Sequence, residues 1–157
     1  MKHFKLLLYI LPFLFINVQT SAQLDCAGTP FGFFEYDPQD PTSEGTEDAI
    51  IYRDKDAQIE YMIGTDIFIF MEIKWNDRCN YSLSVRNTND SNPGITKIDP
   101  LEVQITQSDD RGYNFLVTNE EYKISMTGRI IHLEKEVSPA ILKKVKKTFK
   151  QNKRKFL

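Results

Sequence analysis

The two cysteines, Cys26 and Cys79, are the first residues whose types and spacing could do chemistry. They lie about 50 residues apart, so they cannot form the close CxxC pair of redox enzymes. A zinc site needs His and Cys clustered at short spacing, and the chain contains only 2 His. In an oxidising compartment the two thiols would have only each other, which favours a disulfide. Closing a loop of about 50 residues would stabilise the fold by about 4 kcal/mol in the chain-entropy model.

The remaining residues give little support for catalysis. His132 lies in the alternating segment RIIHLEK, where a structural strand histidine is the favoured interpretation. Nucleophile-elbow, phosphate-loop, dinucleotide-turn and EF-hand motifs are all missing from the sequence. We therefore predict a protein that is not an enzyme, with no catalytic residue and no cofactor.

An acidic segment, residues 37–48, offers the oxygens that a hard cation such as Ca²⁺ would accept. Its prolines extend the chain, and its spacing fits no known metal-binding loop, so we interpret it as a solvated loop and predict no metal site. The carboxylates concerned are Asp37, Asp40, Glu44, Glu47 and Asp48.

Arg53 is the best single candidate for binding chemistry. If segments 49–53 and 58–63 pair across a turn, Arg53 and Glu60 would form a cross-strand ion pair at the surface or at a barrel mouth. Alternatively, Arg53 would line a pocket and hold a ligand carboxylate. The many aromatic residues would either fill a core or line an apolar cavity. The candidate ligand-binding residues are Arg53, Tyr61, Trp75 and Tyr81.

The elements that must position these residues follow from a period-two alternation of apolar side chains. It predicts short strands, separated by turn residues at roughly 8–12-residue spacing, and no helix long enough for a parallel crossover. Asn76 to Arg78 is predicted as a three-residue hairpin loop, and Gly128 as a break between the last two strands. The fold class is therefore all-β, an antiparallel meander forming a calycin-like barrel or half-barrel. A β-sandwich is the alternative. The predicted strands are 31–36, 49–53, 58–63, 67–75, 79–85, 101–106, 113–118, 122–127 and 129–135.

Residues 1–22 have the pattern of a secretory signal peptide. Lys2 and Lys5 precede an apolar run, and small residues up to Ala22 provide a cleavage site. The apolar run is shorter than the roughly 18 residues of a membrane span, so an uncleaved anchor is less favoured. We expect an exported protein, located in the periplasm, on the envelope surface or outside the cell, with residues 23–138 as its β domain.

The C-terminal segment 139–157 differs from the rest of the chain. It holds eight lysines and arginines and no acidic residue, while the 22 acidic residues all precede it. Ser138 and Pro139 form a helix start, and the pattern predicts a basic amphipathic helix of about three turns, fraying beyond Gln151. The residues that would contact a membrane or partner are Ile141, Lys144, Val145, Lys147 and Phe149.

Three interpretations of this helix are open. It packs its apolar face on the sheet, which we favour slightly, or it lies on an anionic membrane surface. Nucleic-acid binding is disfavoured, because the acidic body would repel phosphate.

The order GFFEY, IIYR, QIEY and WNDRCNYSL between Cys26 and Leu83 resembles small exported proteins of unknown function from the Bacteroidota. The resemblance rests on the W-x3-C-x-Y-x-L element and covers less than half of the chain. It implies a secreted, disulfide-bearing, β-rich domain and no particular activity.

These observations favour an exported, non-enzymatic binding module for a small apolar or amphipathic ligand or for an envelope component. The alternative is a structural or interaction protein that uses its basic helix on a membrane surface or on a partner.

Overall fold

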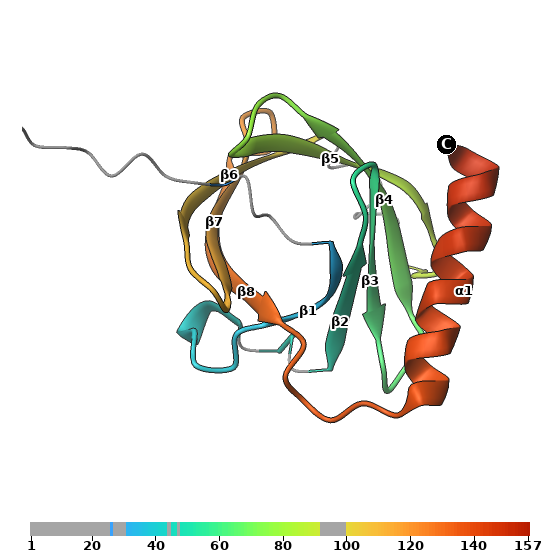
Figure 1. Cartoon of the computed structure of the whole chain (residues 1–157). Coiled ribbons are helices and arrows are strands. Elements are labelled where there is room, and N and C mark those ends of the chain that lie inside the picture. Colours follow the sequence, from blue (N-terminus) through green and yellow to red (C-terminus); the bar gives the residue numbers. More distant parts are fainter. Residues whose placement is uncertain (1–25, 27–30, 44, 47, 92–99) are drawn as a thin grey trace, which may run out of the picture.

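The structure is a computed structural model that describes residue 26 and residues 31–43, 45–46, 48–91 and 100–157 (Figure 1). The predicted signal segment 1–22 lies outside the described residues. A short 3₁₀ helix, η2 (Pro41–Ser43), follows the first strand, and the helix α1 (Pro139–Phe156) follows the last. The strands are β1 (Gly32–Tyr36), β2 (Ala49–Arg53), β3 (Ala57–Met62), β4 (Phe68–Trp75), β5 (Asn80–Thr88), β6 (Leu101–Ser108), β7 (Gly112–Asn119) and β8 (Ile124–His132).

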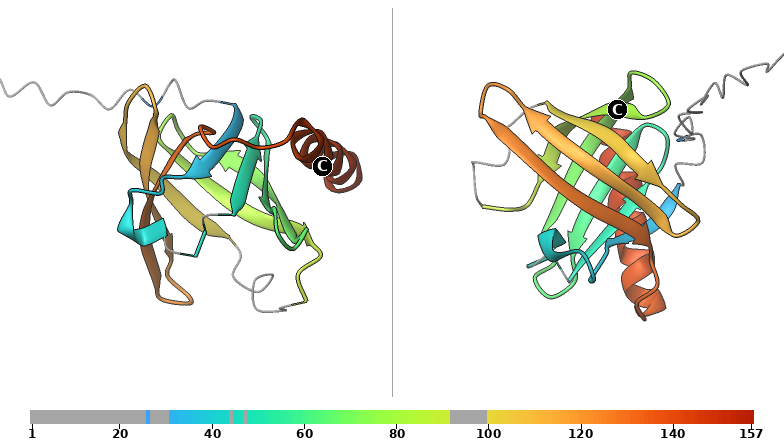
Figure 2. Two further views of the ribbon diagram at one scale, coloured as in Figure 1. Left: turned by 90° about the horizontal axis from the view of Figure 1, so that it is seen from below. Right: turned by 90° about the vertical axis from the view of Figure 1, so that its left-hand side faces the viewer.

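The strands form a closed barrel. Each pairs antiparallel with the next along the chain, and β8 pairs back with β1, where Tyr36 faces Ile130. Figure 1 looks into the ring, and Figure 2 shows the strands wrapping around it. The predicted antiparallel meander with a C-terminal helix is therefore confirmed, as a full barrel and not a half-barrel or sandwich. Closure gives every described strand a neighbouring strand on each side.

Gly128 does not break the last strand, which corrects the prediction. It lies inside β8 directly opposite Phe115 of β7, so segments 122–127 and 129–135 contribute to one continuous strand. A Cβ atom at position 128 would lie 2.6 Å from Cζ of the Phe115 ring. Glycine is therefore needed here to make room for an aromatic side chain, and not to end the strand.

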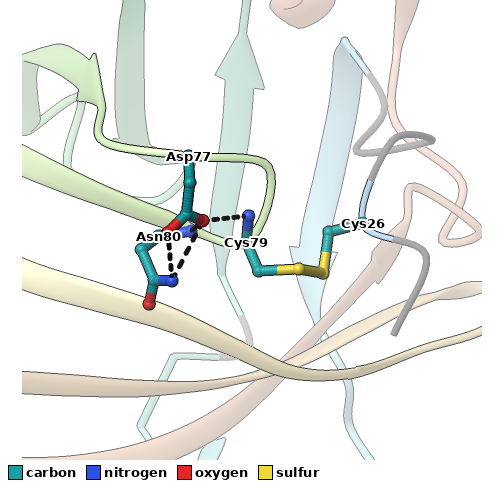
Figure 3. The surroundings of a disulfide bond; sticks show 4 residues. All are labelled: Cys26, Asp77, Cys79 and Asn80. Carbon is teal, nitrogen blue, oxygen red and sulfur yellow. Dashed lines mark hydrogen bonds between the residues drawn. A yellow bond between two sulfur atoms is a disulfide. The ribbon is translucent and has the colours of Figure 1, made fainter. Parts of the chain in front are cut away.

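The predicted disulfide joins Cys26 and Cys79, whose Cα atoms lie 5.2 Å apart although 53 residues separate them (Figure 3). Cys79 ends the turn between β4 and β5, which has four residues and not the three predicted. The Asp77 carboxylate accepts the backbone N–H groups of Cys79 at 2.7 Å and Asn80 at 2.8 Å. These hydrogen bonds hold the pKa of Asp77 below its usual value. The side chain of Asp77 thus stabilises a turn that lacks glycine.

Asp37, at the start of the acidic segment, was expected to be solvated but is buried. Its carboxylate lies 3.1 Å from Nε of Arg129 in β8, and Arg129 also binds Asp109 at 2.7 Å. The ion pair with Arg129 compensates for the burial of this carboxylate. Arg129 lies 92 residues away along the chain, so the local sequence does not indicate the pairing. Glu44 and Glu47 of the same segment lie outside the described residues.

Helix α1 begins as predicted and continues further. The Ser138 side chain accepts the backbone N–H of Ile141, and Pro139 occupies the first turn. The helix runs through Phe156 and does not fray beyond Gln151. Its last turns are held because Asn152 accepts a 2.6 Å hydrogen bond from Asn87 of β5.

The apolar side of α1 packs on the outside of the barrel. Val145 and Phe149 are almost fully buried against Ile59 of β3 and Phe70 of β4. The ring of Phe149 meets that of Tyr52 edge-on, at 4.9 Å between centroids. The favoured interpretation, packing on the sheet, is the arrangement in the structure. Within the described part of the chain, no helix has both the length and the apolar character needed to cross a membrane.

Candidate ligand-binding cavity

A cavity of about 360 Å³ lies inside the barrel. Alternation along the strands directs one set of side chains inward, and the surface that they present to the cavity is mostly apolar. Prominent among them are Ile51, Met71, Leu83, Val103, Phe115 and Val117. Polar side chains form a second group in the lining, and this group includes Tyr36, Arg53, Gln58, Glu60, Tyr81 and Tyr113.

Arg53 is the centre of the polar group. Only 2% of its surface is exposed, so its charge sits inside the barrel. The register places Arg53 beside Gln58, whose Oε1 accepts Nε of Arg53 at 2.8 Å and also accepts Nη2. Nη2 donates to the Tyr81 hydroxyl at 2.9 Å, and Nη1 donates to the Tyr113 hydroxyl. The buried guanidinium is thus bound by neutral oxygens from three other strands.

Tyr81 and Tyr113 contact the guanidinium with their rings as well as with their hydroxyls. Cζ of Arg53 lies 5.0 Å from the ring centroid of Tyr81 and 5.7 Å from that of Tyr113. The hydroxyls of Tyr81 and Tyr113 lie 3.2 Å apart. Burial raises the pKa of Tyr113 well above its usual value, so its phenol stays protonated.

Glu60 does not form the predicted ion pair with Arg53. Gln58 stands between them, because its Nε2 donates to the Glu60 carboxylate at 2.8 Å while its Oε1 accepts from Arg53. Burial raises the pKa of Glu60, against the opposing effect of its hydrogen bonds with Gln58 and Tyr36. The cross-strand register keeps the two charged side chains apart, because Arg53 faces Gln58 and Glu60 faces Ile51. Arg53 is buried at one end of the barrel, so the expected position at the surface is wrong.

Of the four sequence-predicted candidates, Arg53 and Tyr81 line the cavity, and Tyr61 and Trp75 do not. Tyr61 points to the outside of β3, where its hydroxyl donates to Asp66 at 2.5 Å. Trp75 packs against the interior, with its ring centroid 4.6 Å from that of Tyr81, and its Nε1 donates to the Lys55 carbonyl.

Tyr113 and Gln58 are central to the site but were not among the predicted binding residues. Alternation in 113–118 indicates that Tyr113 shares a face with Phe115 and Val117. The sequence contains no signal that β7 would bring Tyr113 to Arg53, which lies 60 residues earlier.

The predicted membrane or partner residues of α1 divide into two groups. Val145 and Phe149 are buried on the barrel, and Ile141 packs at the edge of the same cluster. Lys144 pairs with Asp66 of the β3–β4 turn at 2.6 Å, whereas Lys147 faces solvent.

Comparison with known proteins gives no family model, no curated protein and no solved structure that matches this chain. The cavity and its polar group therefore carry the functional argument alone.

Proposed function

We propose that this protein is an exported, non-enzymatic binding module that takes a small apolar or amphipathic ligand into the barrel. The observation that carries the proposal is the cavity of about 360 Å³, whose surface is mostly apolar and which contains a convergent polar group around Arg53. Small-molecule sites typically have volumes of roughly 300–1,000 Å³ and this combination of lining. A closed barrel suits the role, because its ladder of hydrogen bonds keeps the walls rigid without filling the interior.

The ligand proposal is tested by titrating the protein with an apolar naphthylamine dye and following the dye's fluorescence. We expect saturable binding that is lost in Leu83→Trp, because Leu83 lines the cavity and the larger ring would fill it. Lys74→Trp is the matched control, since it adds the same ring to a side chain that is 64% exposed. Equal binding by both variants would place the dye outside the barrel and contradict the proposal.

Export is the second part of the proposal, and a disulfide between Cys26 and Cys79 is compatible with an oxidising location. The intact mass of the full chain, purified from its own cells without reductant, tests it. We expect a chain that begins at Gln23 and retains the disulfide. A purified chain that still carries residues 1–22, or that has free thiols, would count against it.

As a second candidate, we propose that the side of α1 beside β1 contacts an anionic lipid surface. The supporting observation is a groove between the helix and β1, where Phe33 and Leu142 lie among cationic side chains. Among the described residues, the helix amines that form ion pairs are those of Lys144 and Lys153, on other sides of the helix. The cations of the groove are Lys143, Lys146, Lys147, Lys150 and Arg154.

Sedimentation with phospholipid vesicles tests this second candidate. Because each lysine near an anionic surface contributes about 1 kcal/mol, Lys147→Glu is expected to weaken binding to phosphatidylglycerol vesicles about fivefold or more. Lys74→Glu changes the same charge away from α1 and is expected to have a smaller effect. Equal binding to vesicles of neutral phosphatidylcholine would contradict an electrostatic contact.

A further inference from the structure

The guanidinium of Arg53 and a set of apolar lining side chains lie at opposite ends of the cavity. Arg53 ends β2, whereas Tyr81 and Tyr113 lie at the starts of β5 and β7, and in an antiparallel barrel these positions belong to one end. The opposite end is formed by the starts of β4, β6 and β8, where Ile69, Leu101 and Ile124 line the cavity. A ligand that matches this lining is an amphipath with its head toward Arg53 and its apolar chain toward the other end.

The hydrogen-bond donors around Arg53 exceed the acceptors. A guanidinium has five N–H groups. Four of them are used on Gln58, Tyr81 and Tyr113, and one N–H of Nη1 has no acceptor among the described residues.

The two phenols provide a second hydrogen-bond donor that is not used within the polar group. Tyr81 and Tyr113 each accept an N–H from Arg53, and one phenol O–H donates to the other across 3.2 Å. The O–H of the second phenol then has no acceptor in the described part of the chain. Two donors on neighbouring groups, next to a fixed positive charge, match the two oxygens of a carboxylate.

Glu60 is the competing charge in the lining. Gln58 and Tyr36 hold its carboxylate, and it does not reach the guanidinium. A cationic head would select Glu60, and an anionic head would select Arg53. The spare donors favour the anion, because the described residues supply hydrogen bonds to Glu60 but no acceptor for these donors.

The cavity volume limits the size of the ligand. At the roughly 30 Å³ that a water molecule occupies in the liquid, the cavity holds on the order of a dozen non-hydrogen atoms. A straight-chain carboxylic acid of about ten carbons has this size.

We propose that the barrel binds a medium-chain carboxylic acid, with its carboxylate on Arg53, Tyr81 and Tyr113 and its apolar chain directed between Ile69, Leu101 and Ile124. This inference rests on the proposed ligand-binding function and adds the chemistry of the head group.

The test compares three probes of the same chain length, decanoate, decanol and decylamine, by isothermal titration calorimetry with the full chain. We expect decanoate to bind about tenfold or more tightly than decanol, because charge-assisted hydrogen bonds are about twice as strong as neutral ones. Decylamine is expected to bind weakest. Equal binding of decanoate and decanol, or a preference for decylamine, would overturn the head-group assignment while leaving the ligand-binding function intact. Failure of all three probes would count against the ligand-binding function as well.

Two variants locate the head group. In Arg53→Met we expect the preference for decanoate over decanol to disappear, with the affinity for decanol kept within about threefold. Tyr113→Phe retains the ring but removes the hydroxyl, and it guards against the possibility that Arg53→Met does not fold. It is expected to reduce the preference for decanoate severalfold. An unchanged preference in folded Arg53→Met, or in Tyr113→Phe where only that variant folds, would overturn the assignment.

Discussion

The two faces of β3 carry the opposite of what a barrel strand usually shows. Its inner face presents Gln58 and Glu60 to the cavity, and its outer face presents the apolar Ile59 and Tyr61. The outer face is covered by α1, so it forms a second core outside the barrel, while the inner face holds the polar group around Arg53. Apolar alternation therefore identifies which face of a strand is buried. In β3 the buried apolar face is the outer one, because α1 covers it.

The largest effect is expected where the outer core is broken. Phe149→Ala removes a ring that is 2% exposed and contacts Tyr52 and Phe70, so we expect a loss of about 3–5 kcal/mol in the free energy of unfolding. Urea denaturation measures it. Lys147→Ala, on the solvent side of the same helix, is the control and is expected to change stability by less than about 0.5 kcal/mol. Similar losses in both variants would mean that α1 is not docked by its apolar side.

A smaller loss is expected where the inner polar group is broken. Gln58→Leu leaves two N–H groups of buried Arg53 without their acceptor, which is expected to cost about 2–3 kcal/mol in urea denaturation. Adding Arg53→Met to this variant removes the stranded charge, and part of the stability should return. A double-mutant cycle that shows no coupling would contradict the role of Gln58 as the link.

The third expected effect is a gain in stability, and it depends on pH. Burial raises the pKa of Glu60 above its ordinary value of 4.5, so keeping it ionised destabilises the fold at neutral pH. Glu60→Gln is therefore expected to stabilise the protein at pH 7, because the amide needs no charge to be buried.

This gain should shrink as the pH falls and should vanish below about 4.5, where wild-type Glu60 is protonated in both the folded and the unfolded state. Thermal unfolding across this range gives the difference between the two proteins. A gain that stays constant with pH would show that the charge of Glu60 is not its cause.

The smallest effect is expected at the rim of the outer core. Lys153 pairs with Asp54 at 2.6 Å and with Asp56 at 3.2 Å, and all three side chains are partly exposed. Lys153→Ala is expected to cost less than about 1 kcal/mol, and added salt should reduce the cost. Thermal unfolding at low and high ionic strength measures this, with Lys143→Ala as the control lysine. A cost that salt leaves unchanged would point to packing of the Lys153 stem.

Much of the fold was predictable because its signals are local. Alternation located the strands, with segment 49–53 matching β2 residue for residue, and Ser138 with Pro139 located the start of α1. The pairing of Cys26 with Cys79 followed from there being only 2 Cys. Gly128 was misjudged because its role depends on Phe115, a contact across strands.

The candidate site was less predictable. Arg53 and Tyr81 could be selected by type and phase, whereas Tyr61 has the same alternation but lies on the other face. Period-two alternation separates two faces without saying which one is inside, so Tyr61 was indistinguishable from a lining residue.

The sequence by itself determined an antiparallel meander, one disulfide and a C-terminal amphipathic helix, because each depends on local spacing or on the absence of any other partner. Only the tertiary structure decided that the helix covers β3, that Gln58 separates Arg53 from Glu60, and that Tyr81 and Tyr113 meet on one guanidinium. These outcomes depend on barrel closure, which brings distant strands together and sets which face of each strand encloses the cavity.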